Sequence, residues 1–216
     1  MPFTYDYPHP AVATDVALFT LRAARLNLLL IKRGLEPFAG RWALPGGFLG
    51  ADETLDACAR RELMEETGVV IDAADVHHFD NFSAPDRDPR PNERVISVAY
   101  LALLPSDKLI PRADTDAEDA RWWPARELPA LAFDHDDIVA AAVANLRERA
   151  KAFEILLSLM PASFTLTQLQ SAYDAVTSAA SDKRNFSKAV LASGTIVETG
   201  EHVRGAHRPA RLYRRA

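Results

Sequence analysis

Extended apolar segments dominate the first half of the chain. Two of them, residues 12–22 and 25–34, are separated by a short polar break and are typical of a β-hairpin. Further strands are expected at four places: 41–49, 76–83, 94–104 and, followed by a turn, 118–129. Because strands are so frequent in this half, we expect it to be built around one sheet.

Two helices are expected to accompany this sheet. Residues 54–67 repeat apolar side chains every four positions, and Thr54 and Gly68 suit the N-cap and the C-cap of that helix. A second helix is expected over about 135–149. The sequence FDHDD at its start resembles a cluster of metal ligands, but Asp134 as N-cap, with two more aspartates in the first turn, fits the electrostatics of a helix end. We favour the cap.

The second half of the chain changes to helical spacing. Helical segments are expected at three places: 146–160, 165–178 and, as a short basic helix stopped by a glycine, 182–193. Two strands flanking a loop follow. Helices, a basic helix and a hairpin in this order are typical of a winged helix, so we expect an α+β domain over 1–152 and a smaller winged-helix domain over 153–216.

Composition is that of a globular protein, since 48% of the 216 residues are hydrophobic and 25% are charged. The longest apolar run, 95–104, is about half the length that a membrane-spanning helix needs. The N-terminus lacks the basic start and apolar core of a secretory signal. Cys58 is the single cysteine and cannot form an intramolecular disulfide. We therefore expect a cytoplasmic protein without membrane attachment.

Charge is distributed unevenly along the chain. Residues 1–150 contain 16 Lys and Arg against 25 Asp and Glu, a net charge of −9. Residues 151–216 contain 9 against 5, a net charge of +4. Such asymmetry indicates an anionic partner for the basic end, although an arginine-rich end also occurs on plain solvated surfaces.

Three glutamates crowd one face of the helix expected over 54–67. Glu62, Glu65 and Glu66 are separated by steps of three and four, so they are neighbours and repel each other. Carboxylate oxygens are hard ligands suited to Mg²⁺ or Mn²⁺, and a bound cation would offset the repulsion. The alternative, a solvated acidic face, explains the charges but leaves Gly47, Glu53, Arg61 and Gly68 at their spacing unexplained.

Residues 47–69 resemble the Nudix box at every defining position, from Gly47 through Glu53 and the segment Arg61-Glu62-Leu63-x-Glu65-Glu66-x-Gly68. The resemblance covers about residues 10–150 and implies an α/β/α sandwich with a mixed sheet. It also implies metal-dependent hydrolysis of a nucleoside diphosphate linked to another group, with Arg61 and Glu53 holding the metal ligands in place. Among the carboxylates we expect Glu65 to be the general base, and Glu62, Glu65 and Glu66 to bind metal, but the family varies in these roles.

The segments around the box resemble the subgroup of this family that acts on, or senses, ADP-ribose. Arg33, Arg41 and Arg87 are candidates to pair with diphosphate or ribose oxygens, because guanidinium groups suit phosphate. Gly46 and Gly47 are expected to line the same site. The alternatives are that Arg33 is an ordinary charge at the end of a strand and that Arg87 only solvates a turn.

The basic C-terminal part resembles a recognition helix followed by its wing. Cationic and amide side chains that suit DNA phosphates and base edges occur on the short helix and in the loop: Lys183, Arg184, Asn185, Lys188, Arg208 and Arg211. We expect them to bind double-stranded operator DNA. The alternative is a dimerisation or packing domain with a solvated basic face.

A Nudix domain joined to a winged helix resembles the Nudix-related transcriptional regulators of bacterial NAD metabolism. That family implies ADP-ribose as effector, a homodimer on operator DNA and, in many members, lost catalysis. The box here is intact. We therefore expect an ADP-ribose-binding regulator with a competent metal-dependent site. The alternative is an ADP-ribose pyrophosphatase, releasing AMP and ribose 5-phosphate, whose C-terminal domain only packs or dimerises; a third hypothesis combines both activities.

Overall fold

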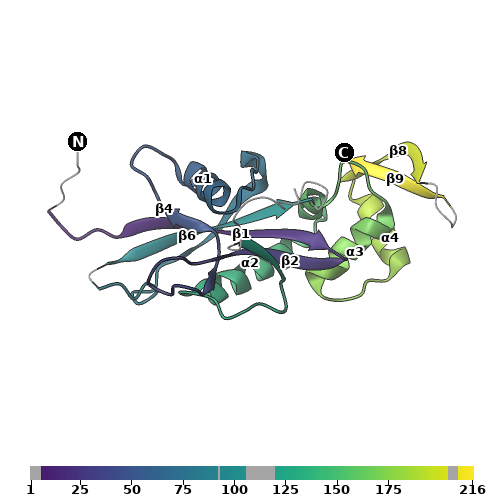
Figure 1. Ribbon diagram of the computed structural model, residues 1–216. Coiled ribbons are helices and arrows are strands. Elements are labelled where there is room, and N and C mark those ends of the chain that lie inside the picture. The colour runs from purple at the N-terminus through teal and green to yellow at the C-terminus, as the bar shows by residue number, and fades with distance from the viewer. Residues whose placement is uncertain (1–5, 92, 106–119, 204–208) are drawn as a thin grey trace.

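A seven-stranded mixed sheet forms the centre of the first domain in the computed structural model, which describes residues 6–91, 93–105, 120–203 and 209–216 (Figure 1). The strands are β1 (Ala11–Arg22), β2 (Arg25–Lys32), β3 (Trp42–Ala43), β4 (Gly46–Phe48), β5 (Val76–Phe82), β6 (Val95–Leu104) and β7 (Ala120–Pro124). Their order is β3-β2-β1-β6-β5, with β4 paired to β1 and β7 paired to β2. Among the strand pairs that the structure describes, β1 and β6 run parallel and the others antiparallel, so the expected mixed sheet is confirmed.

Strand β1 has different partners along its length. Residues 13–15 pair with β4, whereas residues 19–22 pair with β2. The sheet therefore divides on one side of β1, and β2 and β4 follow separate paths. This division places the backbone of the two strands around the candidate site described below.

Helices cover both faces of the sheet. Val16 and Leu18 of β1 pack in one cluster with residues of α1 (Leu55–Thr67), whereas Ala17 and Phe19 pack in another with residues of α2 (His135–Ala150). Because successive side chains of a strand point to opposite faces, the two helices lie on opposite sides of the sheet, as Figure 1 shows. The expected α/β/α sandwich is confirmed, and burial on both faces explains the apolar run at residues 16–19 of β1.

Local capping fixes both ends of α1 as the sequence predicts. The Thr54 hydroxyl accepts a hydrogen bond from the backbone N–H of Ala57 at 3.3 Å. Gly68 adopts the left-handed conformation, with φ of 66°, and its N–H donates to the carbonyl of Met64. Since glycine reaches this conformation without steric cost, the helix ends here and its acidic face keeps a defined orientation.

Two elements differ from the prediction. The strand expected over 41–49 is divided into β3 and β4, because the Pro45 carbonyl accepts from Val16 N–H and turns the chain onto β1. The helix expected over 146–160 stops at Ala150, and a 3₁₀ helix (Glu154–Leu159) follows. Between them Phe153 has a φ of 64°, and its ring packs against aromatic rings of the C-terminal domain. Tertiary packing has overridden local helix propensity.

The capping interpretation of Asp134 is wrong for its side chain. Asp134 occupies the N-cap position of α2, but its carboxylate makes no capping hydrogen bond. The two oxygens instead accept from Nη2 and Nε of Arg87 at 2.7 and 2.9 Å. A bidentate pair with a charged guanidinium is stronger than a single hydrogen bond from a backbone N–H, so Arg87 takes the oxygens that the backbone would have used.

The C-terminal domain has the element order of a winged helix. After the 3₁₀ helix come α3 (Leu166–Thr177), α4 (Lys183–Ala192) and a hairpin of β8 (Ile196–Val203) and β9 (Ala210–Arg215). Reciprocal backbone hydrogen bonds between Phe164 and Tyr213 attach the hairpin to the helices. The expected smaller second domain is confirmed. No helix among the described residues is long and apolar enough to span a bilayer.

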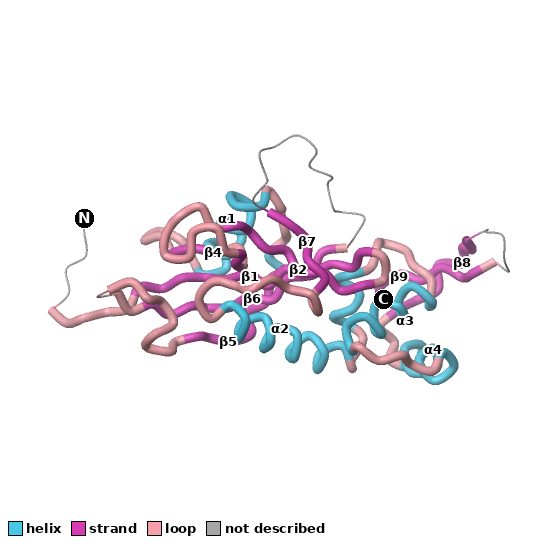
Figure 2. Tube along the Cα trace, turned by 60° about the horizontal axis from the view of Figure 1, so that its bottom comes forward, coloured by secondary structure: helices cyan, strands magenta, loops and turns pink. Residues whose placement is uncertain are grey.

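The two domains share one apolar core. Leu28 and Ile138 of the first domain belong to the same buried cluster as Leu156, Leu169 and Phe186 of the second. Figure 2 shows α2 running from the sheet directly to the C-terminal helices. Because cores are closely packed and resist deformation, the domains are connected through buried side chains as well as through the chain itself.

Candidate functional site

Arg61 of α1 organises the acidic helix face. Its Nε and Nη2 donate to the two carboxylate oxygens of Glu53 at 3.0 and 2.6 Å. Its Nη1 donates to Glu62 at 2.7 Å and to Glu65 at 3.0 Å. Hydrogen bonds from Arg61 and from the backbone N–H of Gly50 lower the pKa of Glu53 to about 2. The arginine therefore holds three carboxylates in a fixed arrangement.

The two glycines at the start of β4 make room for the acidic side chains. A Cβ atom on Gly47 would lie 2.5 Å from the carboxylate of Glu62, and a Cβ on Gly46 would lie 2.1 Å from the Thr14 carbonyl. The Gly46 N–H donates to Glu66 Oε2 at 2.8 Å. The glycine pair is thus required by close approach, and it brings backbone against both Glu62 and Glu66.

Glu66 lies in an environment that disfavours its charged form. Burial is the largest cause, and the neighbouring Glu62 and Asp15 carboxylates act in the same direction, so the pKa of Glu66 rises to about 7 despite the hydrogen bond from Gly46. A partly desolvated carboxylate next to another carboxylate is the kind of group that a cation stabilises in its charged form.

The three glutamates have different partners in this structure. Glu62 and Glu65 share Arg61, whereas Glu66 binds the Gly46 N–H. Over the described ranges, no three His, Cys, Asp or Glu side chains are arranged as a ready metal site. Glu62 and Glu66, however, both face the Gly46-Gly47 backbone, and Mg²⁺ is commonly held by one or two carboxylates together with phosphate oxygens and water. The donor set therefore fits a divalent ion that is completed by a phosphate ligand.

A cavity of about 230 Å³ lies beside these glycines, between β1, β2, β4 and the start of α2. Four of the five residues predicted to bind substrate line it: Arg33, Gly46, Gly47 and Arg87. Arg41 is not among the lining residues, and its guanidinium instead lies 5.4 Å from the centre of the Phe38 ring. The structure thus brings most of the predicted set together.

Arg33 is held at the cavity by its surroundings. Its guanidinium lies 4.6 Å from the centre of the Phe133 ring, and its Nε donates to the Pro37 carbonyl at 2.9 Å. Burial, the largest effect, lowers the pKa of Arg33, although nearby carboxylates oppose this. A partly desolvated, oriented guanidinium at a cavity wall is well placed to meet an anionic ligand.

Arg87 is a buried residue rather than a solvated turn residue. Its side chain is 4% exposed, pairs with Asp134 and lies 3.5 Å from a carboxylate oxygen of Asp15. The alternative of turn solvation is therefore wrong. Since two carboxylates already neutralise this guanidinium, a contact between Arg87 and substrate remains a prediction.

A buried polar network beneath the cavity was missed by sequence reasoning. Ser97 donates to Asp15, whose other oxygen lies 3.4 Å from Nε2 of His135. Nδ1 of His135 accepts from the Leu44 N–H at 2.9 Å, and burial lowers the pKa of this histidine. The available signal was Asp15 itself, a charged residue in the middle of a mostly apolar strand.

The candidate DNA-binding residues lie on the surface of the C-terminal domain. Four of them project from the exposed part of α4: Lys183, Arg184, Asn185 and Lys188. Arg211 of β9 is exposed and pairs with Glu198 at 3.0 Å. Lys183 and Arg211 line one hollow of about 830 Å³ between the helices and the hairpin. Arg208 lies outside the described residues.

Known proteins match both parts of the chain. Residues 10–142 match the NUDIX domain, and residues 156–215 match the NrtR DNA-binding winged helix domain. The chain is 36% identical to the ADPR responsive transcriptional repressor NtrR of Acinetobacter baylyi over 97% of its own length and 83% of that protein. It is 39% identical to the ADP-ribose pyrophosphatase of Methanocaldococcus jannaschii, over 62% of this chain and 73% of that one.

A solved structure extends this agreement to the arrangement of both domains. The crystal structure of Shewanella oneidensis NrtR complexed with a 27mer DNA superposes with a TM-score of 0.78 at 29% identity, covering 95% of this chain and 93% of that one. These comparisons point to the same two domains as the geometry of the Nudix box and of the basic helix does. The chain belongs to the Nudix family, among the members that join this domain to an NrtR-type DNA-binding winged helix.

Proposed function

We propose that the protein is an ADP-ribose-responsive transcriptional regulator that binds operator DNA through its C-terminal domain. The observation that carries this proposal is the relationship to an ADPR responsive repressor over 97% of the chain, across both domains. We place the boundary between the Nudix domain and the winged-helix domain after residue 152. Operator binding implies a cytoplasmic protein.

The effector site is the cavity beside Gly46 and Gly47. Arg33 contributes an oriented guanidinium to its wall, and Arg90 contributes a second one. Guanidinium groups bind phosphate oxygens in a fixed, forked geometry. ADP-ribose, or a related nucleoside diphosphate, therefore places its diphosphate between these arginines and the acidic face of α1. Arg41 contributes only if the ligand extends beyond the cavity.

We further propose that the site retains hydrolase activity. When bound, Mg²⁺ or Mn²⁺ neutralises phosphate charge and lowers the pKa of an attacking water. Glu62 and Glu66, which both lie against the Gly46-Gly47 backbone, would hold the ion, and the exposed Glu65 would complete the set or accept the proton of the water. Arg61 and Glu53 position the carboxylates.

DNA binding is assigned to the exposed face of α4. Lys183, Arg184 and Lys188 neutralise backbone phosphates, and Asn185 reads an adenine edge. Arg211 follows the DNA backbone from the hairpin, and we assign the same role to Arg208 from the sequence alone. Because a winged helix reads one half-site, we propose a homodimer on an operator with two-fold symmetry.

One experiment tests both activities together. An operator duplex is first selected from a random-sequence library by the protein itself. ADP-ribose is then titrated into the protein–DNA complex with Mg²⁺, while DNA release is followed by fluorescence anisotropy and AMP production by chromatography. We expect DNA release at ADP-ribose concentrations that saturate the protein, accompanied by AMP. If the protein shows no salt-dependent binding to duplex DNA, the proposal that it is a transcriptional regulator is overturned.

A second candidate function is an ADP-ribose pyrophosphatase whose C-terminal domain only packs or dimerises. Arg61 forms ion pairs with both Glu53 and Glu62, and this intact arrangement favours hydrolase activity of the Nudix domain. Release of AMP without any duplex binding supports it, whereas duplex binding without release of AMP excludes it.

A further inference from the structure

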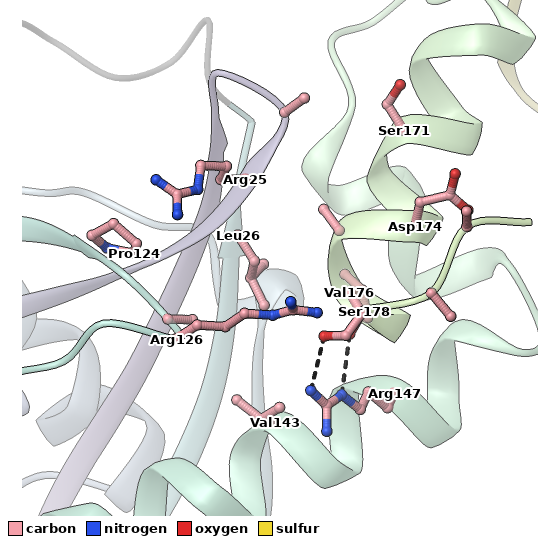
Figure 3. Close-up of a pocket in the computed structure, with 15 residues that line it drawn as sticks. Arg25, Leu26, Pro124, Arg126, Val143, Arg147, Ser171, Asp174, Val176 and Ser178 are labelled. Carbon is pink, nitrogen blue, oxygen red and sulfur yellow. Dashed lines mark hydrogen bonds between the residues drawn. The ribbon is translucent and has the colours of Figure 1, made fainter.

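A second cavity, of about 450 Å³, lies between the two domains (Figure 3). Its walls come from the β1–β2 turn, the end of β7, helix α2 and the C-terminal half of α3 with the turn that follows. It shares no lining residue with the cavity proposed for ADP-ribose. Its volume lies within the range of small-molecule binding sites, about 300–1,000 Å³.

Positive charge is concentrated in this cavity. Three arginines line it: Arg25, Arg126 and Arg147. Arg25 pairs with Glu127, but Arg126 makes no ion pair or hydrogen bond with any residue that the structure describes. Figure 3 shows Arg126 extending across the cavity towards the part of the wall where Arg147 lies. Two guanidinium groups that point into one space repel each other, and an anion between them would remove this cost.

Arg147 already connects the two domains at this place. From α2, its Nε donates to the carbonyl of Val176 at 3.2 Å, and its Nη2 donates to the hydroxyl of Ser178 at 3.0 Å. These acceptors lie at the C-terminal end of α3, where backbone carbonyls lack helical partners. The remaining N–H groups of the guanidinium are available to a ligand, so a bound anion would contact a residue that holds the domains together.

The rest of the lining suits an organic molecule rather than a bare anion. Leu26, Val143 and Val176 provide apolar surface. Asp174 accepts one hydrogen bond from the Ser181 N–H at 2.9 Å, and its second oxygen has no hydrogen-bond donor among the described residues. A free carboxylate oxygen is a good acceptor for a sugar hydroxyl. The cavity is therefore lined by cationic groups, by apolar surface and by a hydrogen-bond acceptor, which together suit an organic anion.

The rim of the cavity is also conformationally strained. Ala23 and Ala24 both have positive φ, 48° and 56°, in the β1–β2 turn, and Ala24 lines the cavity. Such turns ordinarily carry glycine or asparagine, because a Cβ atom is disfavoured at these angles. Strain of this kind persists where surrounding structure maintains it, often beside ligand sites.

We propose that the interdomain cavity binds a small phosphorylated sugar compound, the size of a nucleoside monophosphate, and that this ligand stabilises the present arrangement of the two domains. The phosphate binds between Arg126 and Arg147, a sugar hydroxyl donates to Asp174, and the remainder of the ligand packs on the apolar wall. The site is separate from the ADP-ribose cavity and does not depend on hydrolysis.

Isothermal titration calorimetry of the full chain with AMP, in EDTA, tests the site. We expect binding that Arg126→Gln weakens at least tenfold, while Arg121→Gln, on the same strand region but outside the cavity, has no effect. Arg33→Gln separates this site from the ADP-ribose cavity. If Arg33→Gln abolishes AMP binding and Arg126→Gln does not, or if wild type binds no AMP, the proposal is overturned.

Two further measurements test the ligand class and its effect on the domains. Inorganic phosphate should bind at least tenfold more weakly than AMP; equal affinity overturns the assignment to an organic phosphate. Hydrogen–deuterium exchange of residues 171–180 should slow when AMP is added to wild type and stay unchanged in Arg126→Gln. Unchanged exchange in wild type with bound AMP overturns the proposed effect on the domain arrangement.

Discussion

Arg61 and His135 each fix a different part of the site proposed for ADP-ribose through side-chain contacts. Arg61 donates to Glu62 on α1, and His135 accepts the N–H of Leu44 just before the Gly46-Gly47 pair. The glycine pair is thus positioned by α1 on one side and by α2 on the other. We therefore expect a substitution on the α1 side to change activity, and a substitution of His135 to change folding stability.

Glu62→Gln should abolish metal-dependent release of AMP from ADP-ribose while leaving the fold intact. The amide keeps the shape of the side chain next to Gly47 but removes the negative charge that a divalent ion requires. We expect at least a 100-fold lower rate, measured by chromatography, with an unchanged circular dichroism spectrum. Glu148→Gln, an exposed position on α2, is the matched control. A wild-type rate in Glu62→Gln would remove Glu62 from the metal site.

His135 should make folding stability depend on pH. Burial lowers its pKa in the folded protein below the ordinary value near 6.5. The unfolded chain therefore binds a proton at a higher pH than the folded chain does, and stability falls as pH decreases below about 6.5, by up to about 1.4 kcal/mol per pH unit. Above that pH the contribution of His135 to stability is fully present.

His135→Gln tests this dependence because glutamine cannot titrate but can still accept the Leu44 N–H. Urea unfolding at pH 7.5, 6.5 and 5.5 should give a shallower loss of stability in this variant than in wild type. His202→Gln, at an exposed position on β8, should keep the wild-type slope. Equal slopes in wild type and His135→Gln would contradict the assignment.

At the scale of elements, a helix end could be predicted from the sequence when the residues that fix it are close together in the chain, and not when its partner is distant. The caps of α1 were predictable, because Thr54 and Gly68 act on backbone groups within four residues. The role of Asp134 was not, since its partner Arg87 is 47 residues away in sequence. The end of α2 was predicted to within one residue, but the helical continuation expected over 146–160 was wrong, because Phe153 turns the chain to reach rings that later helices provide.

Gly47→Ala should disturb the close contact between strand β4 and Glu62 of helix α1. The added Cβ would lie 2.5 Å from the carboxylate carbon of Glu62, so either the strand or the glutamate must move. Because the atoms in the way are the far end of the flexible Glu62 side chain, we expect loss of metal-dependent activity with a smaller loss of unfolding free energy than the about 1–3 kcal/mol of core overpacking. Gly34→Ala, with no atom within 4 Å of its Cβ, should be close to neutral in both assays.

The exposed start of α4 should carry the salt-dependent part of DNA binding. Replacing Lys183 and Arg184 together by alanine removes two cations that are exposed in the structure. The slope of log affinity against log salt should fall by about 2, since each phosphate contact contributes about 0.9. Anisotropy titrations at several salt concentrations measure this slope. Lys151→Ala, an exposed lysine at the end of α2, is the control and should leave it unchanged.

At the scale of the whole molecule, the composition and order of the domains were readable from sequence, but the surfaces between them were not. The Nudix box and the basic helix are local patterns with strong constraints on spacing. The two cavities and the Asp15 network are formed by residues far apart in sequence, whose proximity follows from the pairing of strands. Such sites have no signature in a single sequence beyond isolated polar residues in apolar segments.

Arg147→Ala should weaken communication between the domains. It removes both hydrogen bonds to the end of α3 but touches neither the ADP-ribose cavity nor α4. We expect near wild-type affinities for ADP-ribose alone and for operator DNA alone. The factor by which ADP-ribose changes the affinity for DNA should be at least threefold smaller than in wild type. Glu148→Ala is the control on the same helix. An undiminished effect would show that the buried core alone transmits the signal.

The parallel pairing of β1 with β6 also has a consequence for biosynthesis. Thr20 lies opposite Leu104, so the central strand of the sheet lacks one neighbour until more than a hundred residues have been translated. During that interval β1 can pair on one side only, with β2 and β4. Nascent chains paused before β6 should therefore recruit chaperones, and release of the chaperone should coincide with emergence of β6 from the ribosome.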